Sequence, residues 1–523
     1  MVCLLIGALY SLYKGQDADW DLKNYHLYNC WALLHDRLNI DLGAAGIQAY
    51  FNPLLDLPYY LLGTGVLKHL PRVLAALQGL WYGGLIFFLL QIAVRLSGLH
   101  GRSFGVIDLL AVLIGATGTM AMSQAGLSSN EMPLALLMLA GIHQLLPLCA
   151  AELPSRAWRH AVIAGCLCGM AVGLKPTAMI YPPALGLALL FALGARATAW
   201  RLSALFALGT CAGFLLTYGW WGWTLFELTG NPTFPMFNQW FHSPLMPANS
   251  GTDVRFLPRS TAQWLFYPFY WIRPSSGLVT ESPVADARIA LTLLAIVGLA
   301  AMAWLRRARP STERRAVRLL TIFVTAGYVL WLGMFSILRY TVSIEVLSGL
   351  IMLLAVQELP GSQRADGSAR RWPAWTMLCL FLLLAGSSTH PDWGHAPYAD
   401  VAFDVHAPAV EPGSMVVLVG APQAYVIPFI DRAQASQYLG LTNLTKRSQN
   451  HGITQATRER LLAYRGPTYA LLRDDAGEYL AMLKQWLPGA KLTDCSTIRS
   501  NLEHDQSNVD VSSNLRLCRL QRS

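Results

Sequence analysis

The acidic stretch that decides the fold is DADWDLKNYH, residues 17–26, directly after the first apolar segment. Three of its residues are carboxylates, Asp17, Asp19 and Asp21. Nearly everything after residue 50 is dominated by long apolar runs, so these acids stand where a hydrophobic segment ends and water begins. We therefore take this stretch as the candidate site and work outward from it.

The composition is that of a membrane protein. The chain has 523 residues, of which 54% are hydrophobic and 13% charged, with a mean hydropathy of +0.38. A soluble domain has roughly 25% charged residues. The net charge of +9 comes from basic residues at the ends of apolar runs and in short loops, as the positive-inside rule expects. This pattern indicates membrane topology and not a nucleic-acid partner.

The apolar runs predict an all-α polytopic membrane domain over residues 1–388, with about 11–13 transmembrane helices. Residues 2–13 are expected to form the first helix. A crossing needs roughly 20 residues, and the candidate spans are 54–70, 72–94, 104–122, 132–150, 159–175, 177–195, 201–223, 287–305, 317–335, 337–356 and 373–388. Pro53, Pro58 and Gly63 interrupt residues 53–70, and this segment is the one expected not to cross fully.

Two large loops are expected on the extracytoplasmic face, residues 15–52 (the first loop) and 224–284. The densest basic group is assigned to the cytoplasm and consists of Arg306, Arg307, Arg309, Arg314, Arg315 and Arg318. Within the first loop, apolar side chains recur at helical spacing from Leu27 to Leu38, which predicts a helix lying on the membrane surface. A neighbouring face that would look toward a cavity carries Asp21, Asn24, Tyr25 and Tyr28.

The tail, residues 389–523, has a soluble composition and predicts a small extracytoplasmic α/β domain. Its expected strands are 415–419 and 469–472, and its expected helices are 454–464 and 477–486. Cys495 and Cys518 flank a polar stretch, and a disulfide between them is expected if the tail lies outside the cytoplasm.

The acids of the first loop allow more than one chemistry. Asp19 and Asp21 form a D-x-D pattern whose oxygens could hold a divalent metal. Alternatively, one carboxylate is a general base that takes the proton of an attacking hydroxyl. A solvated acidic loop at a membrane edge is the structural alternative. No cofactor is certain from the sequence.

Charged residues next to apolar runs give further candidates, because ionisable groups there are costly and often functional. Lys175 either serves a site or extends to the interface. Arg339, next to Tyr340, either binds a phosphate or pairs with Glu345. Asn130 and Glu131 stand at the outer end of a span, and His26 is an interfacial polar residue or a site residue.

These residues resemble the GT-C class of integral-membrane glycosyltransferases. The resemblance rests on an acid followed four residues later by Tyr25 after the first span, a Pro-containing second segment, the Gly173-Leu174-Lys175 turn and the soluble tail. Residues 24–29 (NYHLYN), 50–54 (YFNPL) and 230–232 (GNP) are similar to a poorly characterised bacterial branch of this class. The resemblance covers about residues 1–390.

The resemblance implies transfer of a sugar from a polyprenyl-phosphate donor to a lipid, glycan or protein acceptor at the outer face of the bacterial inner membrane. It implies that a carboxylate of the first loop serves as general base or orients the acceptor, and Asp21, with Asp19 beside it, is the matching catalytic residue. Tyr25, His26, Asn130, Glu131, Lys175, Arg339 and Tyr340 are the substrate-binding candidates, and Lys175 and Arg339 would stabilise the leaving phosphate. Leu22 stands where the class often has Glu, which leaves open which acid acts.

Two other functions remain open from the sequence. One is a transporter or flippase of a lipid-linked or polar substrate, although no internal repeat of the transporter kind is visible. The other is a scaffold that keeps the GT-C fold without activity. Turnover that depends on Asp21 would separate the enzyme from both.

The tail disulfide gives the first testable prediction. Intact protein digested without reductant should yield one peptide pair joined through Cys495 and Cys518 by mass spectrometry, because an oxidising compartment preserves such bonds. Free thiols at both positions would show that the pairing is wrong.

Overall fold

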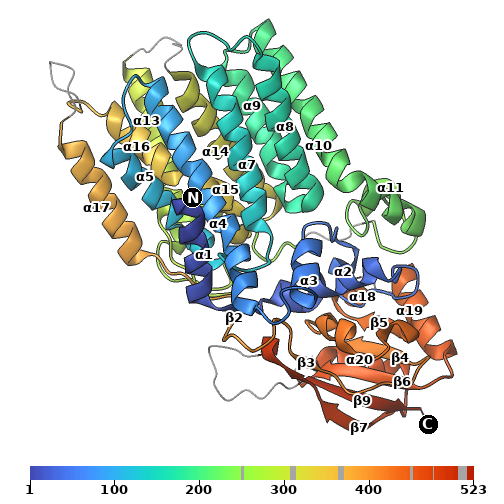
Figure 1. Ribbon diagram of the computed structural model, residues 1–523. Coiled ribbons are helices and arrows are strands. Elements are labelled where there is room, and N and C mark those ends of the chain that lie inside the picture. The colour runs from blue at the N-terminus through green and yellow to red at the C-terminus, as the bar shows by residue number, and fades with distance from the viewer. Residues whose placement is uncertain are drawn as a thin grey trace.

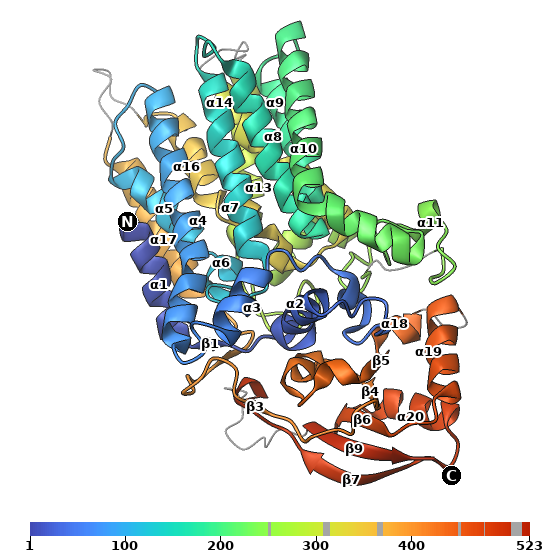
Figure 2. The ribbon, with the colours of Figure 1, turned by 45° about the vertical axis from the view of Figure 1, so that its right-hand side comes forward.

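The computed structural model describes residues 1–248, 253–306, 314–362, 370–447, 451–474, 476–503 and 515–522. A bundle of long helices forms one layer and the α/β tail forms the other (Figure 1). Short helices of the first loop lie between the two layers, as the turned view also shows (Figure 2). The acidic stretch is therefore placed at the junction of bundle and tail. Arg307 and Arg309 of the basic group lie outside the described residues.

Six helices of the described part are long and apolar enough to cross a membrane, or seven if one bent pair counts as a span. The long helices are α4 (Pro71–Leu99), α7 with η3 (Glu131–Cys149), α8 (Ala157–Leu174), α10 (Ala197–Thr229), α13 (Arg288–Leu305) and α14 (Arg315–Met334). The bent pair joins η7 (Leu338–Thr341) and α15 (Val342–Glu345) to α16 (Ser348–Glu358) at an angle of 45°. The multi-pass membrane architecture expected from the sequence is confirmed.

The remaining apolar helices of the described bundle are shorter. They are α1 (Val2–Lys14), α5 (Val106–Ala116), η4 with α9 (Pro176–Ala192) and α17 (Trp372–Ser387). Six or seven described helices have the length and composition of a span, so the expected count of 11–13 requires these shorter helices to cross as well. Residues 54–70 contain only α3 (Leu57–Thr64), too short for a span, as the interrupting prolines and glycine suggested.

Glycines hold neighbouring helices of the bundle at close range. On α8, Gly165, Gly169 and Gly173 recur every fourth residue and face α10. A Cβ atom at Gly165 would lie 2.0 Å from the Phe206 carbonyl oxygen, and one at Gly213 would lie 2.0 Å from that of Cys166. Small residues at this spacing let membrane helices approach backbone to backbone, and the last glycine of this contact lies two residues before Lys175.

The first loop is buried, in contrast to the expected helix on the membrane surface. It contains the π-helix η1 (Leu22–His26), α2 (Leu27–Leu34) and η2 (Gly46–Tyr50). Leu27 and Trp31 are 1% and 3% exposed and belong to an apolar core shared with the tail. The first part of the apolar face that predicted a membrane-surface helix is therefore covered by protein of the tail, whereas Leu34 at the end of α2 is 47% exposed.

The tail is built on a five-stranded sheet with the order β5-β4-β6-β9-β7. The strands are β4 (Met415–Val419), β5 (Gln437–Leu441), β6 (Thr468–Arg473), β7 (Lys491–Thr497) and β9 (Leu515–Gln521). The first three run parallel, whereas β9 is antiparallel to β6 and β7. Helices α19 (Gly452–Ala463) and α20 (Gly477–Trp486) agree with the predicted ones. A disulfide joins Cys495 on β7 to Cys518 on β9.

Two strand contacts tie the first loop to the tail. Strand β1 (Gln16–Asp17) pairs antiparallel with β2 (His395–Ala396). Farther along, the Leu42 backbone extends the sheet beside β5, because its N–H donates to the Tyr438 carbonyl (3.0 Å) and its carbonyl accepts from the Gly440 N–H (2.9 Å). The loop is thus anchored on the tail before and after its helices.

A buried ion pair secures the second contact. Arg37 Nη2 lies 2.8 Å from Asp41 Oδ1, and both side chains are almost fully buried. Arg37 also donates to the carbonyls of Gln434 and Ser436 in the tail, and Asp41 accepts from the Tyr438 N–H at 3.0 Å. These bonds link one edge of the sheet to the first loop.

Asp41→Asn should lower the free energy of unfolding by about 3 kcal/mol, because it leaves the buried Arg37 without its anionic partner. The measurement is chemical unfolding in detergent, with the proteolytic cleavage of the tail as the readout. Asp36→Asn is the matched control, since Asp36 is exposed in the same loop. Equal stabilities of the two variants would contradict the anchoring role.

Candidate functional site

Four charged side chains from distant segments meet where η1, α7, α8 and η7 converge. We call Asp21, Glu131, Lys175 and Arg339 the charge cluster. Arg339 Nη1 donates to Asp21 Oδ2 at 3.1 Å, and Lys175 Nζ lies 3.9 Å from the same oxygen. Lys175 Nζ also donates to Glu131 Oε1 at 2.7 Å, and Arg339 Nε lies 4.0 Å from that oxygen. Two carboxylates and two cations thus form a closed set.

Local backbone geometry places each member. Lys175 follows the last residue of α8 in an extended conformation, and its Nζ also donates to the Ser129 carbonyl at 2.7 Å. Asn52 holds the same turn by donating to the carbonyls of Gly173 (2.9 Å) and Thr217 (2.8 Å). Lys175 is 5% exposed, so it pairs inside the protein and does not reach for solvent.

Asn130 starts α7 in the left-handed region with φ 74°. Asparagine is one of the few side chains that tolerate this conformation. Its Nδ2 donates to Asp56 Oδ1 at 2.8 Å, which fixes the turn that presents Glu131. Asp56 in turn lies 2.6 Å from His26 Nδ1.

The other two acids of the stretch shape the loop. Asp17 accepts from the backbone N–H groups of Ser128 (2.8 Å) and Asp19 (3.1 Å), and Asp19 accepts from that of Leu22 (2.6 Å). Both carboxylates are buried. Of the three acids, Asp21 is the one that forms ion pairs with both cations of the charge cluster among the described residues.

The pKa values of Asp19 and Asp21 are shifted in opposite directions. Burial, followed by the charges of Asp17 and Asp21, raises the pKa of Asp19 well above its usual value. Burial also opposes ionisation of Asp21, but the charges of Arg339, Lys175 and His26 hold the pKa of Asp21 below its usual value. Asp21 is therefore the acid held as a carboxylate at neutral pH.

Two aromatic candidates lie on the segments that carry Asp21 and Arg339. Tyr25 is 3% exposed, and its ring centroid lies 4.1 Å from that of His26. Burial, with the nearby carboxylates Asp21, Asp56 and Glu131, raises the pKa of Tyr25 well above its usual value, so its hydroxyl stays protonated. Tyr340 lies under the Arg339 guanidinium, 5.4 Å from ring centroid to Cζ.

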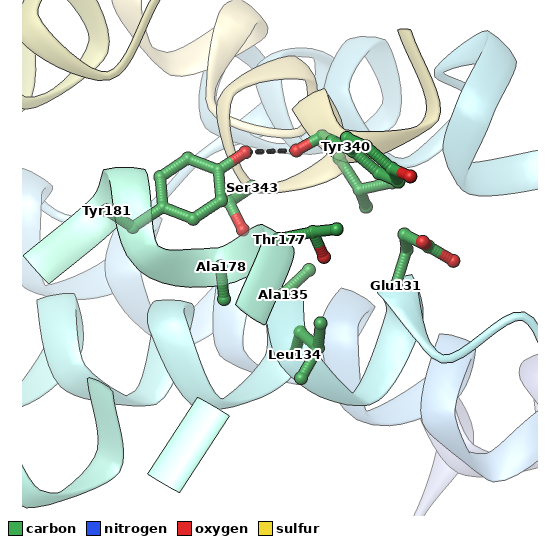
Figure 3. A pocket seen from close by; sticks show the side chains of 9 residues that line it. Glu131, Leu134, Ala135, Thr177, Ala178, Tyr181, Tyr340 and Ser343 are labelled. Atoms are coloured by element: carbon green, nitrogen blue, oxygen red, sulfur yellow. Dashed lines mark hydrogen bonds between the residues drawn. The ribbon is translucent and has the colours of Figure 1, made fainter. Parts of the chain in front are cut away.

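A small pocket adjoins the charge cluster (Figure 3). Its wall comes from α7, from the η4–α9 turn and from η7 and α15, and includes Glu131, Thr177, Tyr181, Tyr340 and Ser343. The Tyr181 hydroxyl donates to the Tyr340 carbonyl and braces the segment that carries Arg339. Glu131 Oε2 is buried without a hydrogen-bond partner among the described residues, so it remains an acceptor beside the charge cluster.

The donor set does not fit a divalent cation at Asp19 and Asp21. Asp19 Oδ1 is engaged by the Leu22 N–H, and Asp21 Oδ2 faces two cationic side chains. Across the described ranges, no three His, Cys, Asp or Glu side chains are grouped as metal ligands. The expected alternative of a metal at this D-x-D pattern therefore has no support in the contacts.

The structure also places residues that sequence reasoning missed or left open. Arg339 pairs with Asp21, while Glu345 accepts from the backbone N–H groups of Met120 and Ala121, both at 2.9 Å. The alternative pairing of Arg339 with Glu345 is thus not the one seen. Asp56 was missed, although an acid beside Pro53 and Pro58 in an apolar segment was a usable signal.

Comparisons with known proteins identify the fold. No protein-family model matches the chain, and no curated protein matches it. It is similar to the cryo-EM structure of arabinofuranosyltransferase AftD from Mycobacteria, with 16% identity and a TM-score of 0.50 over 99% of this chain and 39% of that one.

Two further structures are each 14% identical, with a TM-score of 0.49. ArnT from Cupriavidus metallidurans bound to undecaprenyl phosphate covers 99% of this chain and 96% of its own. The Archaeoglobus fulgidus oligosaccharyltransferase covers 93% of this chain and 70% of its own. The chain has the GT-C membrane fold expected from the sequence. At these identities the likeness concerns the fold alone.

Two substitutions at Asn130 should separate its backbone role from its hydrogen bond. Asn130→Gly keeps the positive φ and loses only the bond to Asp56, costing about 1–3 kcal/mol. Asn130→Ala adds about 1–2 kcal/mol for a left-handed residue with a Cβ. Unfolding in detergent should therefore rank wild type, Gly and Ala in falling stability, and an Ala variant as stable as the Gly variant would refute the backbone part.

Proposed function

We propose that the chain is a membrane glycosyltransferase that moves a sugar from a polyprenyl-phosphate carrier to an acceptor, with Asp21 as the general base. The observation that carries this proposal is the contact of Asp21 with Arg339 and Lys175 inside a GT-C fold. It joins the carboxylate that would act on the acceptor to the cations that would receive the phosphate. The acceptor is a lipid, glycan or protein at the extracytoplasmic face of the bacterial inner membrane.

The guanidinium of Arg339 is the accessible cation of the charge cluster. Its side chain is 30% exposed, against 6% for that of Lys175. A guanidinium binds phosphate oxygens through two parallel hydrogen bonds, and an ammonium adds a point charge. We infer that the donor phosphate binds first to Arg339, with Lys175 behind it.

Phosphate binding would also activate the base. In the structure the cations lower the pKa of Asp21, which makes its carboxylate a weak proton acceptor. When a phosphate takes over Arg339, Asp21 loses part of this stabilisation and its basicity rises. The base thus becomes effective only with the donor in place.

The reaction then follows from these roles. The acceptor oxygen attacks the anomeric carbon while Asp21 takes its proton, and the bond from that carbon to the phosphate oxygen breaks. Arg339 and Lys175 stabilise the charge that develops on the departing phosphate. Tyr25, with its protonated hydroxyl among the carboxylates, is placed to orient sugar or acceptor hydroxyls.

Asp21→Asn should reduce transfer by about 10²–10⁴-fold, because the amide cannot take a proton. The donor should bind at least as tightly, since Arg339 loses its competing anion. The assay is transfer from a pool of radiolabelled polyprenyl-phosphate sugars to membrane extract, with equilibrium binding of polyprenyl phosphate alongside.

Asp36→Asn is again the matched control and should behave as wild type. Transfer by Asp21→Asn at the wild-type rate would remove Asp21 as base. Failure of wild type with a broad donor set would reject the transferase function and favour the transporter or scaffold.

A further inference from the structure

A buried glutamine links the backbone of Arg339 to a hydrogen-bond partner of Lys175. Gln124 is 0% exposed and directly follows the short helix α6 (Thr119–Ser123). Its Nε2 donates to the Arg339 carbonyl at 3.3 Å, and its Oε1 accepts from the Ser129 hydroxyl at 3.0 Å. The Ser129 carbonyl in turn accepts from Lys175 Nζ at 2.7 Å. One amide therefore connects the two cations of the charge cluster through groups that they carry or contact.

The partners of Gln124 fix the orientation of its amide. A carbonyl oxygen only accepts hydrogen bonds, so the amide nitrogen must face the Arg339 carbonyl. The amide oxygen then faces the Ser129 hydroxyl, which donates to it. An amide that is buried without such bonds is costly. The link thus requires a side chain that donates at one end and accepts at the other.

Helix α6 holds Gln124 against the segment that carries Arg339. Glu345 on α15 accepts from the backbone N–H groups of Met120 and Ala121 in α6. The N–H of Gln124 donates to the Met120 carbonyl at 3.2 Å, so Gln124 is bound to the same helix. Because α15 directly follows η7, the beginning of α6 is tied to α15 and its end, through Gln124, to η7. Both ends of α6 therefore fix Gln124 relative to Arg339.

The two cations that Gln124 connects converge on one atom. Arg339 Nη1 and Lys175 Nζ lie 3.1 and 3.9 Å from the same oxygen of Asp21. A phosphate oxygen in place of this carboxylate oxygen would meet the same two cations. Long cationic side chains have many rotamers, so both reach one phosphate only if their backbones are held at a fixed separation. A misplacement of about 1 Å can lower a rate by about 10²-fold.

We propose, on the basis of the proposed transferase function, that Gln124 is a positioning residue that holds Arg339 and Lys175 as one clamp for the donor phosphate. Gln124 does not bind the phosphate itself. It sets the separation of the two cations through the Arg339 carbonyl and through Ser129. Without this link both cations remain present and charged, but they no longer act together on one phosphate, so the donor binds less tightly.

The test is equilibrium binding of radiolabelled undecaprenyl phosphate to purified protein in detergent, which gives both the Kd and the number of sites. Gln124→Met keeps the approximate side-chain length and removes both hydrogen bonds. Its Kd should rise by about 10-fold, the usual scale for the loss of one or two hydrogen bonds. The number of sites should stay unchanged. A merely structural role would lower the number of binding-competent molecules and leave the Kd of the others at the wild-type value.

Ser129→Ala tests one half of the link. It removes the hydroxyl that donates to Gln124 and keeps the backbone carbonyl that accepts from Lys175. Its Kd should therefore lie between those of wild type and Gln124→Met. This variant carries the test if Gln124→Met does not fold.

Gln144→Met is the matched control. Gln144 is half-buried near the end of α7, and its Oε1 lies 3.2 Å from His160 Nδ1 on α8. The change removes a hydrogen bond of a glutamine amide about 20 Å along α7 from Glu131, at 1.5 Å per residue. Its Kd should equal that of wild type.

Arg339→Ala shows whether Gln124 acts through the clamp. Addition of Gln124→Met to this variant should raise the Kd by a factor about 3-fold smaller, or less, than in wild type, because coupled residues are not additive. Equal factors in the two backgrounds would refute the proposal, since Gln124 would then act without Arg339.

The outcomes distinguish this inference from the proposed function. The clamp is refuted if Gln124→Met binds undecaprenyl phosphate with the wild-type Kd, or if Gln144→Met raises the Kd as much. Either result leaves the transferase proposal in place, because that proposal depends on Asp21. A wild-type protein that binds no polyprenyl phosphate would instead reject the donor class and the clamp together.

Discussion

A charged side chain that is buried without a partner of opposite charge is costly, and this constraint organises the junction of bundle and tail. Two carboxylates and two cations are paired there. Removing an ion from water costs several kcal/mol even after relaxation, unless a partner of opposite charge is held against it. Asp21, Glu131, Lys175 and Arg339 each come from a different segment, and each finds its partner only when all four segments are in place. The first loop, the start of α7, the end of α8 and η7 are therefore fixed relative to one another.

The sequence predicts the members of this site better than their pairing. A charged residue next to apolar runs can be recognised from the sequence alone, which is how Lys175, Arg339 and Glu131 became candidates. The partner of Arg339 is 318 positions away, whereas Glu345 is six positions away and was an equally reasonable choice. Strands β4 and β6 were predicted because they are continuous apolar runs, but the burial of the first loop was not, since its cover comes from the tail.

The three acids of the stretch are all aspartates, yet their contacts give them different roles. Asp17 and Asp19 accept backbone N–H groups and hold the turn, while Asp21 faces the cations. A resting ion pair keeps Asp21 charged at the cost of basicity, and a phosphate would exchange that state for a more basic one. The same contact thus stabilises the fold without substrate and would couple donor binding to proton transfer.

The strand contacts of the first loop have a consequence for biosynthesis. Residues 16 and 17 pair with 395 and 396, and Leu42 adds to the edge of β5, so a segment made at the beginning is completed by one made near the end. While the ribosome is still producing the bundle, the acidic stretch lacks the strands that shape it. Docking of the first loop on β2 and β5 must therefore wait for the tail, so a nascent chain stopped after α17 would lack both strand contacts of this loop.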